Sequence, residues 1–131
     1  MAGTVAGAAG RGLSGESDLG RLLAGMAPRL HDRAYAFRCG EAAGNAFALV
    51  HEDEGVTVVA EEEGGGWARI SLTVHSSLAA VGLSAAISSA LATAGISANI
   101  IAGYHHDHIF VPWDRRIDAM AVLDQLSGDR S

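Results

Sequence analysis

The stretch ISLTVHSSLAAVGLSAAISSALATAGISANIIAGYHH, from Ile70 to His106, decides the fold because it contains no Asp, Glu, Lys or Arg. Such a stretch is expected in a protein core, a subunit interface or a membrane. Its uncharged run from Leu78 to Ala94 contains Ser and Thr and is shorter than the roughly 20 apolar residues that a membrane helix needs. We therefore expect a buried helix, whose second face of Ala, Ser and Thr packs on another subunit.

The hydrophobic period changes along this stretch. Residues 67–74 alternate between apolar and polar side chains, which predicts a half-buried strand. In the helix that follows, Leu83, Ile87 and Leu91 fall one turn apart, and Gly95 stands where a left-handed cap is common. Residues 96–102 and 108–111 then read as two further strands joined by a tight connection. The predicted unit is β-α-β-β.

The first half of the chain predicts a helix and a hairpin. The expected elements are a helix capped by Ser17 and ended by Pro28, a turn at 31–33, and strands at 35–39, 46–50 and 56–60. The sequence EEEGGG at 61–66 is expected to be a flexible joint, so the halves divide into residues 16–63 and 64–131, after a disordered tail at 1–15.

A last helix, capped by Asp114, follows the central unit. The order β-α-β-β-α predicts an α+β fold, a ferredoxin-like sandwich with both helices on one face of an antiparallel sheet. A final strand is missing from this order. We expect a strand of the first half, or of a second subunit, to fill the vacant edge.

Composition limits the function classes. The 131 residues carry a net charge of −6, all nine cations are Arg, and no basic cluster stands out, so nucleic acid is not an expected partner. The one cysteine, Cys39, has no partner for an internal disulfide or a zinc ribbon, which suits a reducing compartment. With no secretory signal pattern in the first dozen residues, a cytoplasmic location is expected.

The sequence HSSLAAVGLSAAISSALATAGISANIIAGYHHDHIFVP at 75–112, with LLAGMAPRL at 22–30, resembles small uncharacterised bacterial ACT-domain proteins. The resemblance implies two tandem ACT-like βαββαβ modules of the amino-acid-kinase regulatory type, the N-terminal one shortened and incomplete, and the C-terminal one an ACT domain. It also implies a homodimer or higher homo-oligomer. A small polar metabolite, such as an amino acid, would then bind at the interface, in a regulatory protein that is not an enzyme.

The resemblance also implies where a ligand binds: between the loop after the first strand of one module and the second strand of a neighbour. In this chain these segments contain His75, Ser76, Ser77, Leu78, Val81, Gly82 and Leu83, and then Ala98, Asn99, Ile100 and Ile101. The loop lacks the Pro-Gly and the acidic residue often found there. Within an apolar strand, Asn99 is expected to be buried, so its amide is either paired inside the protein or left for a ligand.

Four histidines form the other candidate site. Because the first and second strands of the unit are expected to run parallel, His75 and the hairpin with His105, His106 and His108 should meet at one end of the sheet. Imidazoles at this spacing can bind a transition metal. Two alternatives remain open: a polar ligand site without metal, and a structural turn in which Asp107 bonds its own backbone. A purely structural oligomerisation module is the third function class.

Overall fold

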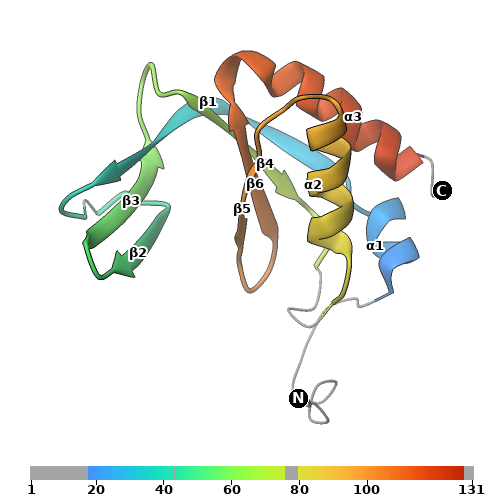
Figure 1. Ribbon diagram of the computed structural model, residues 1–131, viewed down its shortest axis with the longest axis horizontal. Helices are drawn as coiled ribbons and strands as arrows, with labels where there is room; N and C mark the ends of the chain where they lie inside the picture. The colour runs from blue at the N-terminus through green and yellow to red at the C-terminus, as the bar shows by residue number, and fades with distance from the viewer. Residues whose placement is uncertain (1–17, 43, 76–79, 129–131) are drawn as a thin grey trace, which may run out of the picture.

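The computed structural model describes residues 18–42, 44–75 and 80–128. In chain order the elements are α1 (Leu19–Ala24), β1 (Pro28–Cys39), β2 (Ala48–Glu52), β3 (Gly55–Glu61), β4 (Trp67–Leu72), α2 (Leu83–Thr93), β5 (Asn99–Ala102), β6 (Asp107–Pro112), the 3₁₀ turn η2 (Trp113–Arg115) and α3 (Arg116–Gly128). The strands form one six-stranded antiparallel sheet in the order β2-β3-β1-β4-β6-β5. Figure 1 shows the helices beside β4, β5 and β6, while the β2–β3 hairpin extends away from them.

The second half of the chain has the predicted ferredoxin-like order. Strand β6 lies between β4 and β5 and is antiparallel to both, so β4 and β5 run parallel. The vacant edge beside β4 is filled by β1, with pairs such as Pro28 with Leu72 and Leu30 with Ile70. The α+β sandwich is therefore confirmed, and its fourth strand comes from the first half of the same chain.

Strand β1 is longer than predicted. It begins at Pro28, where we expected a helix to end, and it continues through residues 31–33, where we expected a turn. The register on β4 shifts between Leu30 and Ala34, which marks a bulge that absorbs the extra residues. The polar residues at 31–33 resemble a turn in composition, but tertiary pairing keeps them in the strand.

Helix α1 is correspondingly short. Its N-cap is Asp18, whose carboxylate accepts a hydrogen bond from the Arg21 backbone N–H at 3.0 Å. The predicted cap, Ser17, lies outside the described residues. Helix α2 begins at Leu83, whereas the sequence predicted a start at Leu78. Residues 76–79, which include Leu78, also lie outside the described residues.

Alternation along the central strands builds one core against the helices. Ala68, Ile70 and Leu72 of β4 are fully buried on the helix face. They pack with side chains of all three helices and of β6: Leu22, Leu23, Leu83, Ile87, Leu91, Ala119, Leu123, Ile109 and Val111. Burying each large aliphatic side chain stabilises the fold by about 1.5–3 kcal/mol. In the described part of the chain, no helix is long and apolar enough to cross a membrane.

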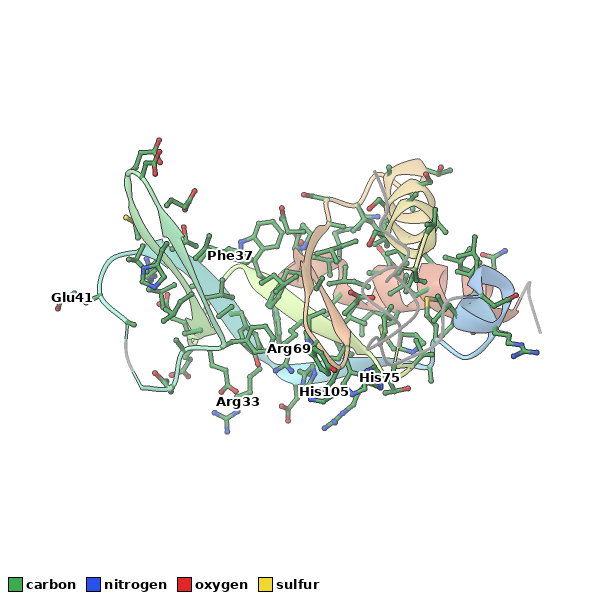
Figure 2. All side chains as sticks on the ribbon, turned by 90° about the horizontal axis from the view of Figure 1, so that it is seen from below. Arg33, Phe37, Glu41, Arg69, His75 and His105 are labelled. Carbon is green, nitrogen blue, oxygen red and sulfur yellow. The ribbon has the colours of Figure 1, made fainter. Side chains whose placement is uncertain are left out.

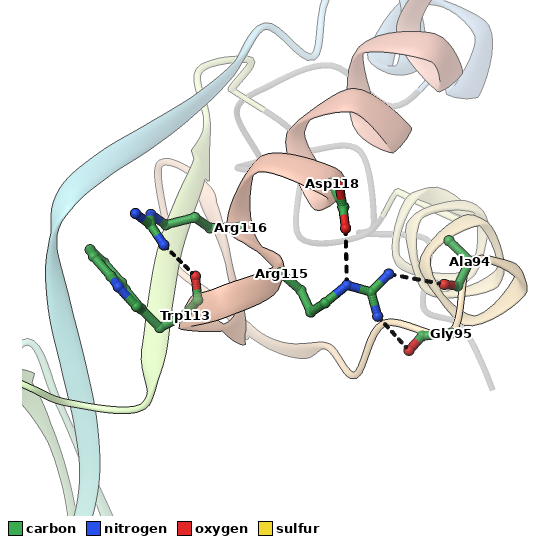
Figure 3. A network of polar contacts seen from close by, with 6 residues as sticks. All are labelled: Ala94, Gly95, Trp113, Arg115, Arg116 and Asp118. Atoms are coloured by element: carbon green, nitrogen blue, oxygen red, sulfur yellow. Dashed lines mark hydrogen bonds and ion pairs between the residues drawn. The ribbon is translucent and has the colours of Figure 1, made fainter.

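Arg115 fixes the junction between α2, η2 and α3 (Figure 3). Arg115 donates to the carbonyls of Ala94 and Gly95 at 3.3 and 3.4 Å, and to the Asp118 carboxylate at 3.1 Å. Gly95 has φ +74°, as expected for a left-handed helix end. The predicted cap Asp114 instead lies in η2, and α3 begins at Arg116. Two carbonyls at the end of α2 are thus satisfied by the side chain of Arg115 in η2.

The joint between the halves is a hydrogen-bonded turn rather than a loose linker. The Glu62 N–H donates to the Ala34 carbonyl and the Trp113 N–H donates to the Gly66 carbonyl, both at 2.9 Å. A side chain at Gly65 would place its Cβ 2.5 Å from the Tyr35 carbonyl oxygen, so only glycine fits there. Gly65 of EEEGGG therefore allows close packing at this turn.

Candidate functional site

Three histidines meet at the tip of the β5–β6 hairpin, as the parallel course of β4 and β5 predicts. The His75 ring centroid lies 5.6 Å from that of His105 and 6.4 Å from that of His106, and Tyr104 is 6.3 Å away. Figure 2 shows His75 and His105 on the same side of the molecule. His106 Nδ1 lies 3.3 Å from the Val74 carbonyl oxygen, which anchors the hairpin to the end of β4.

The fourth predicted histidine does not join this tip. His108 lies on the sheet face opposite the helices, where its Nδ1 is 2.7 Å from the Ser71 hydroxyl and its ring packs on Phe47 at 4.9 Å. Within residues 18–42, 44–75 and 80–128, no group of three or more His, Cys, Asp or Glu side chains is placed to hold a metal ion. The imidazoles therefore divide between two sites.

Strand β5 is an edge of the sheet, so its polar residue is not buried. Asn99 is exposed, and it pairs with Phe110 on the face away from the helices. The expectation of a buried Asn99 is wrong because β5 has a neighbour on one side only. Ala98 and Ile100 instead pack against the core. Ile101 lies with His108 on the sheet face opposite the helices, which we call the open face.

The loop before α2 is described only in part. Ser76, Ser77 and Leu78 lie outside the described residues. Val81 is 82% exposed, whereas Leu83 is 4% exposed and packs in the core. Gly82 has φ +100° at the start of α2, and a Cβ there would lie 3.1 Å from Leu19. Close packing and the left-handed backbone therefore require glycine at this position.

A second polar cluster, which the sequence did not reveal, lies on the open face of the sheet. Its centre is Arg69, whose Nη1 donates to the Tyr35 hydroxyl at 2.8 Å and whose guanidinium stacks 4.1 Å from the Phe47 ring centre. Beside it, the Ser71 hydroxyl bridges His31 Nε2 at 2.8 Å and His108 Nδ1 at 2.7 Å. We name Tyr35, Phe47, Arg69, Ser71, His31 and His108 the open-face cluster.

The environment keeps both imidazoles of this cluster neutral at pH 7. Burial, followed by the positive charge of Arg69, lowers the pKa of His108 to about 4. The same two causes lower the pKa of His31, whereas the carboxylates of Asp32 and Glu61 act in the opposite direction. Arg69 therefore remains the charged centre of the cluster.

Comparison with known proteins decides the family. An ACT domain matches residues 64–125, and a second ACT domain matches residues 14–73. A crystal structure from Vibrio cholerae, of a protein of unknown function called a possible transport protein, is 41% identical with a TM-score of 0.69. The likeness covers 79% of this chain and 91% of that chain. This chain belongs to the ACT-domain family.

The ACT fold is also seen at low sequence identity. A protein from Agobacterium tumefaciens is 14% identical, with a TM-score of 0.61, over 76% of this chain and 87% of that chain. No curated protein matches the chain at a significant level. ACT domains are generally regulatory modules that bind small molecules, and this is the general role that the family gives to this protein.

The ACT resemblance predicts ligand contacts in the loop before α2 and in β5, but none in the open-face cluster. Its members come from β1, β4, β6 and the segment before β2, so they are far apart in sequence. The one available signal was the alternation in β4, which places Arg69 and Ser71 on the same face, away from Ile70 and Leu72.

Proposed function

We propose that this ACT-domain protein is a cytoplasmic regulatory or sensing module that binds a small polar metabolite, such as an amino acid, at a homodimer interface. The observation that carries the proposal is the position of β5. This strand forms an edge of the sheet, with Asn99 exposed at its start. An ACT-type dimer would bring this edge against the partner's loop before α2.

Exposed apolar side chains support an interface in this region. Val81 before α2 is 82% exposed and Tyr104 after β5 is 60% exposed. Edge strands and large exposed apolar side chains are both features that association with another chain would cover. In the proposed complex, the backbone near Val81 and Gly82 and the amide of Asn99 contact the metabolite from opposite protomers.

A role without catalysis agrees with the geometry around Ser71 in the open-face cluster, whose hydroxyl contacts two histidines. The Ser71 hydroxyl lies at hydrogen-bond distance from His108, as a nucleophile and its base would. However, Ser71 is buried, and its hydroxyl is engaged by His31 as well. Because the Ser71 hydroxyl is held between two imidazoles, we assign these contacts to structure and positioning.

Calorimetric titration with each common amino acid at millimolar concentration tests the ligand. We expect heat of binding from at least one of them, and a loss of that heat in Asn99→Ala. Asn45→Ala is the matched control, because Asn45 is also exposed but lies in the segment before β2. No heat with any amino acid, in a protein that is dimeric, would favour a purely structural oligomerisation module.

Native mass spectrometry of the untagged protein tests the assembly and any retained ligand together. We expect a dimer that carries the added mass of a small organic molecule. A dimer that retains a transition metal would instead support the alternative function, metal binding, although the described residues place no group of three ligands together. A monomer would contradict the proposed interface.

A further inference from the structure

Arg69 has a donor that no described residue accepts. Its side chain extends from β4 onto the open face of the sheet (Figure 2), where Nη1 is bonded to the Tyr35 hydroxyl. Its Nε is fully buried and has no hydrogen-bond partner among the described residues. Buried donors are normally paired, and a charged one that is unpaired is costly, so this nitrogen calls for an acceptor.

The surroundings of Arg69 suit an anionic acceptor. No ion pair joins its guanidinium to a carboxylate within the described part of the chain. Phe47 stacks on one face of the guanidinium and Phe110 is its neighbour on β6, so the charge lies against aromatic rings and is partly screened from water. A charge-assisted hydrogen bond is strongest in such surroundings.

The Ser71 bridge can supply a further donor. With both imidazoles neutral and the Ser71 proton inside the chain His31–Ser71–His108, the ring that accepts that proton must carry its own hydrogen on the outer nitrogen. One imidazole N–H can therefore point out of the bridge. This N–H adds a second kind of donor to the cluster, beside the guanidinium of Arg69.

Nearby negative charges limit the ligand's total charge. Glu61 pairs with Tyr35 across the sheet, so it lies on the same face, and both Glu61 and Asp32 are close enough to influence His31. A ligand with a second anionic group would be repelled by them. An amino acid, whose ammonium balances its carboxylate, would not be.

We propose that Arg69, Tyr35 and the imidazoles bridged by Ser71 form a binding site for a small monocarboxylate on the open face of the sheet. The carboxylate accepts hydrogen bonds from the edge of the Arg69 guanidinium, including Nε, and from one imidazole. Because Nε is buried and Phe47 stacks on the guanidinium, this binding requires the Phe47 ring to move. This site is separate from the β5 edge, and it does not depend on the dimer proposed above.

The direct test is a ¹H–¹⁵N NMR titration that follows the arginine Nε–H signals, with the Arg69 signal assigned by its loss in Arg69→Lys. Acetate and L-alanine are the probes, and acetamide is the neutral analogue of acetate. We expect a saturable shift of the Arg69 signal with acetate or L-alanine, and none with acetamide. Succinate should bind more weakly than acetate.

Variants separate the site from general salt effects. Arg69→Lys keeps the charge but loses the Nε donor, and should weaken binding of the probe roughly tenfold or more. The matched control is Arg116→Lys, because Arg116 also stacks on an aromatic ring, Trp113, at 3.9 Å, and donates its Nη1 to a backbone carbonyl. Its replacement should leave carboxylate binding unchanged.

Two results would overturn the proposal. One is an Arg69 signal in the wild-type protein that does not saturate with any carboxylate. The other is an equal response to chloride at the same ionic strength, which would show nonspecific screening. Both are read on wild-type protein, and the variant serves only to assign the signal. Asn99→Ala should leave this titration intact, and so a failure here is distinguishable from a failure at the β5 edge.

Discussion

Acidification should destabilise this protein through His108. Folding lowers the pKa of this imidazole from 6.5 to about 4, chiefly through burial and then through Arg69. Between these two values the unfolded chain binds a proton that the folded chain does not, so stability falls as the pH falls. Each unit by which folding shifts a pKa is worth about 1.36 kcal/mol of stability. Because the ring is only partly buried, we expect a loss of about 2–3 kcal/mol.

The loss should be absent in a variant that cannot titrate at this position. His108→Asn retains a polar partner for Ser71, and its free energy of unfolding should fall less than that of the wild type between about pH 7.5 and about pH 4.5. Urea unfolding at a series of pH values measures the difference. His51→Asn is the control, because His51 is exposed on β2. If the wild type and His108→Asn lose stability in parallel, burial of a neutral His108 is not the cause.

Three further changes test the packing. Ile87 is 1% exposed on the buried face of α2, so Ile87→Ala should cost about 2–5 kcal/mol and Ile87→Asp should unfold the protein. Ser88→Asp, on the exposed face of α2, should be tolerated, and thermal melts compare the three variants. Gly65→Ala should lower stability by about 1–3 kcal/mol because its Cβ meets the Tyr35 carbonyl, while Gly66→Ala, with open space, should be neutral in the same urea assay. Arg115→Ala should cost about 1–2 kcal/mol and increase hydrogen exchange at the end of α2, and unchanged exchange there would contradict its capping role.

Periodicity was sufficient to predict the second half of the fold. The spacing of Leu83, Ile87 and Leu91 identified the buried face of α2, and alternation identified β4. The vacant edge beside β4 was also predicted, because an incomplete ferredoxin-like sheet needs a fourth strand. These features follow from local sequence and from the general rules of layered packing.

The first half and the sites depend on tertiary contacts that local sequence does not encode. Residues 31–33 look like a turn, yet pairing with β4 holds them in a bulged strand. Asn99 looks buried by its neighbours, but the sheet order places it at an edge. The contact between Arg69 and Phe47 joins segments whose relation is set only when β1 has paired on both sides.

The double pairing of β1 has a consequence for how the protein folds during synthesis. The hairpin β2–β3 can pair with residues 35–39 of β1 as soon as it leaves the ribosome. Residues 28–30 must wait for β4, and meanwhile they present an unpaired strand edge to other nascent chains. Slow translation after the joint would prolong this exposure. Chaperone dependence should therefore be greatest in the interval before the second half of the chain emerges.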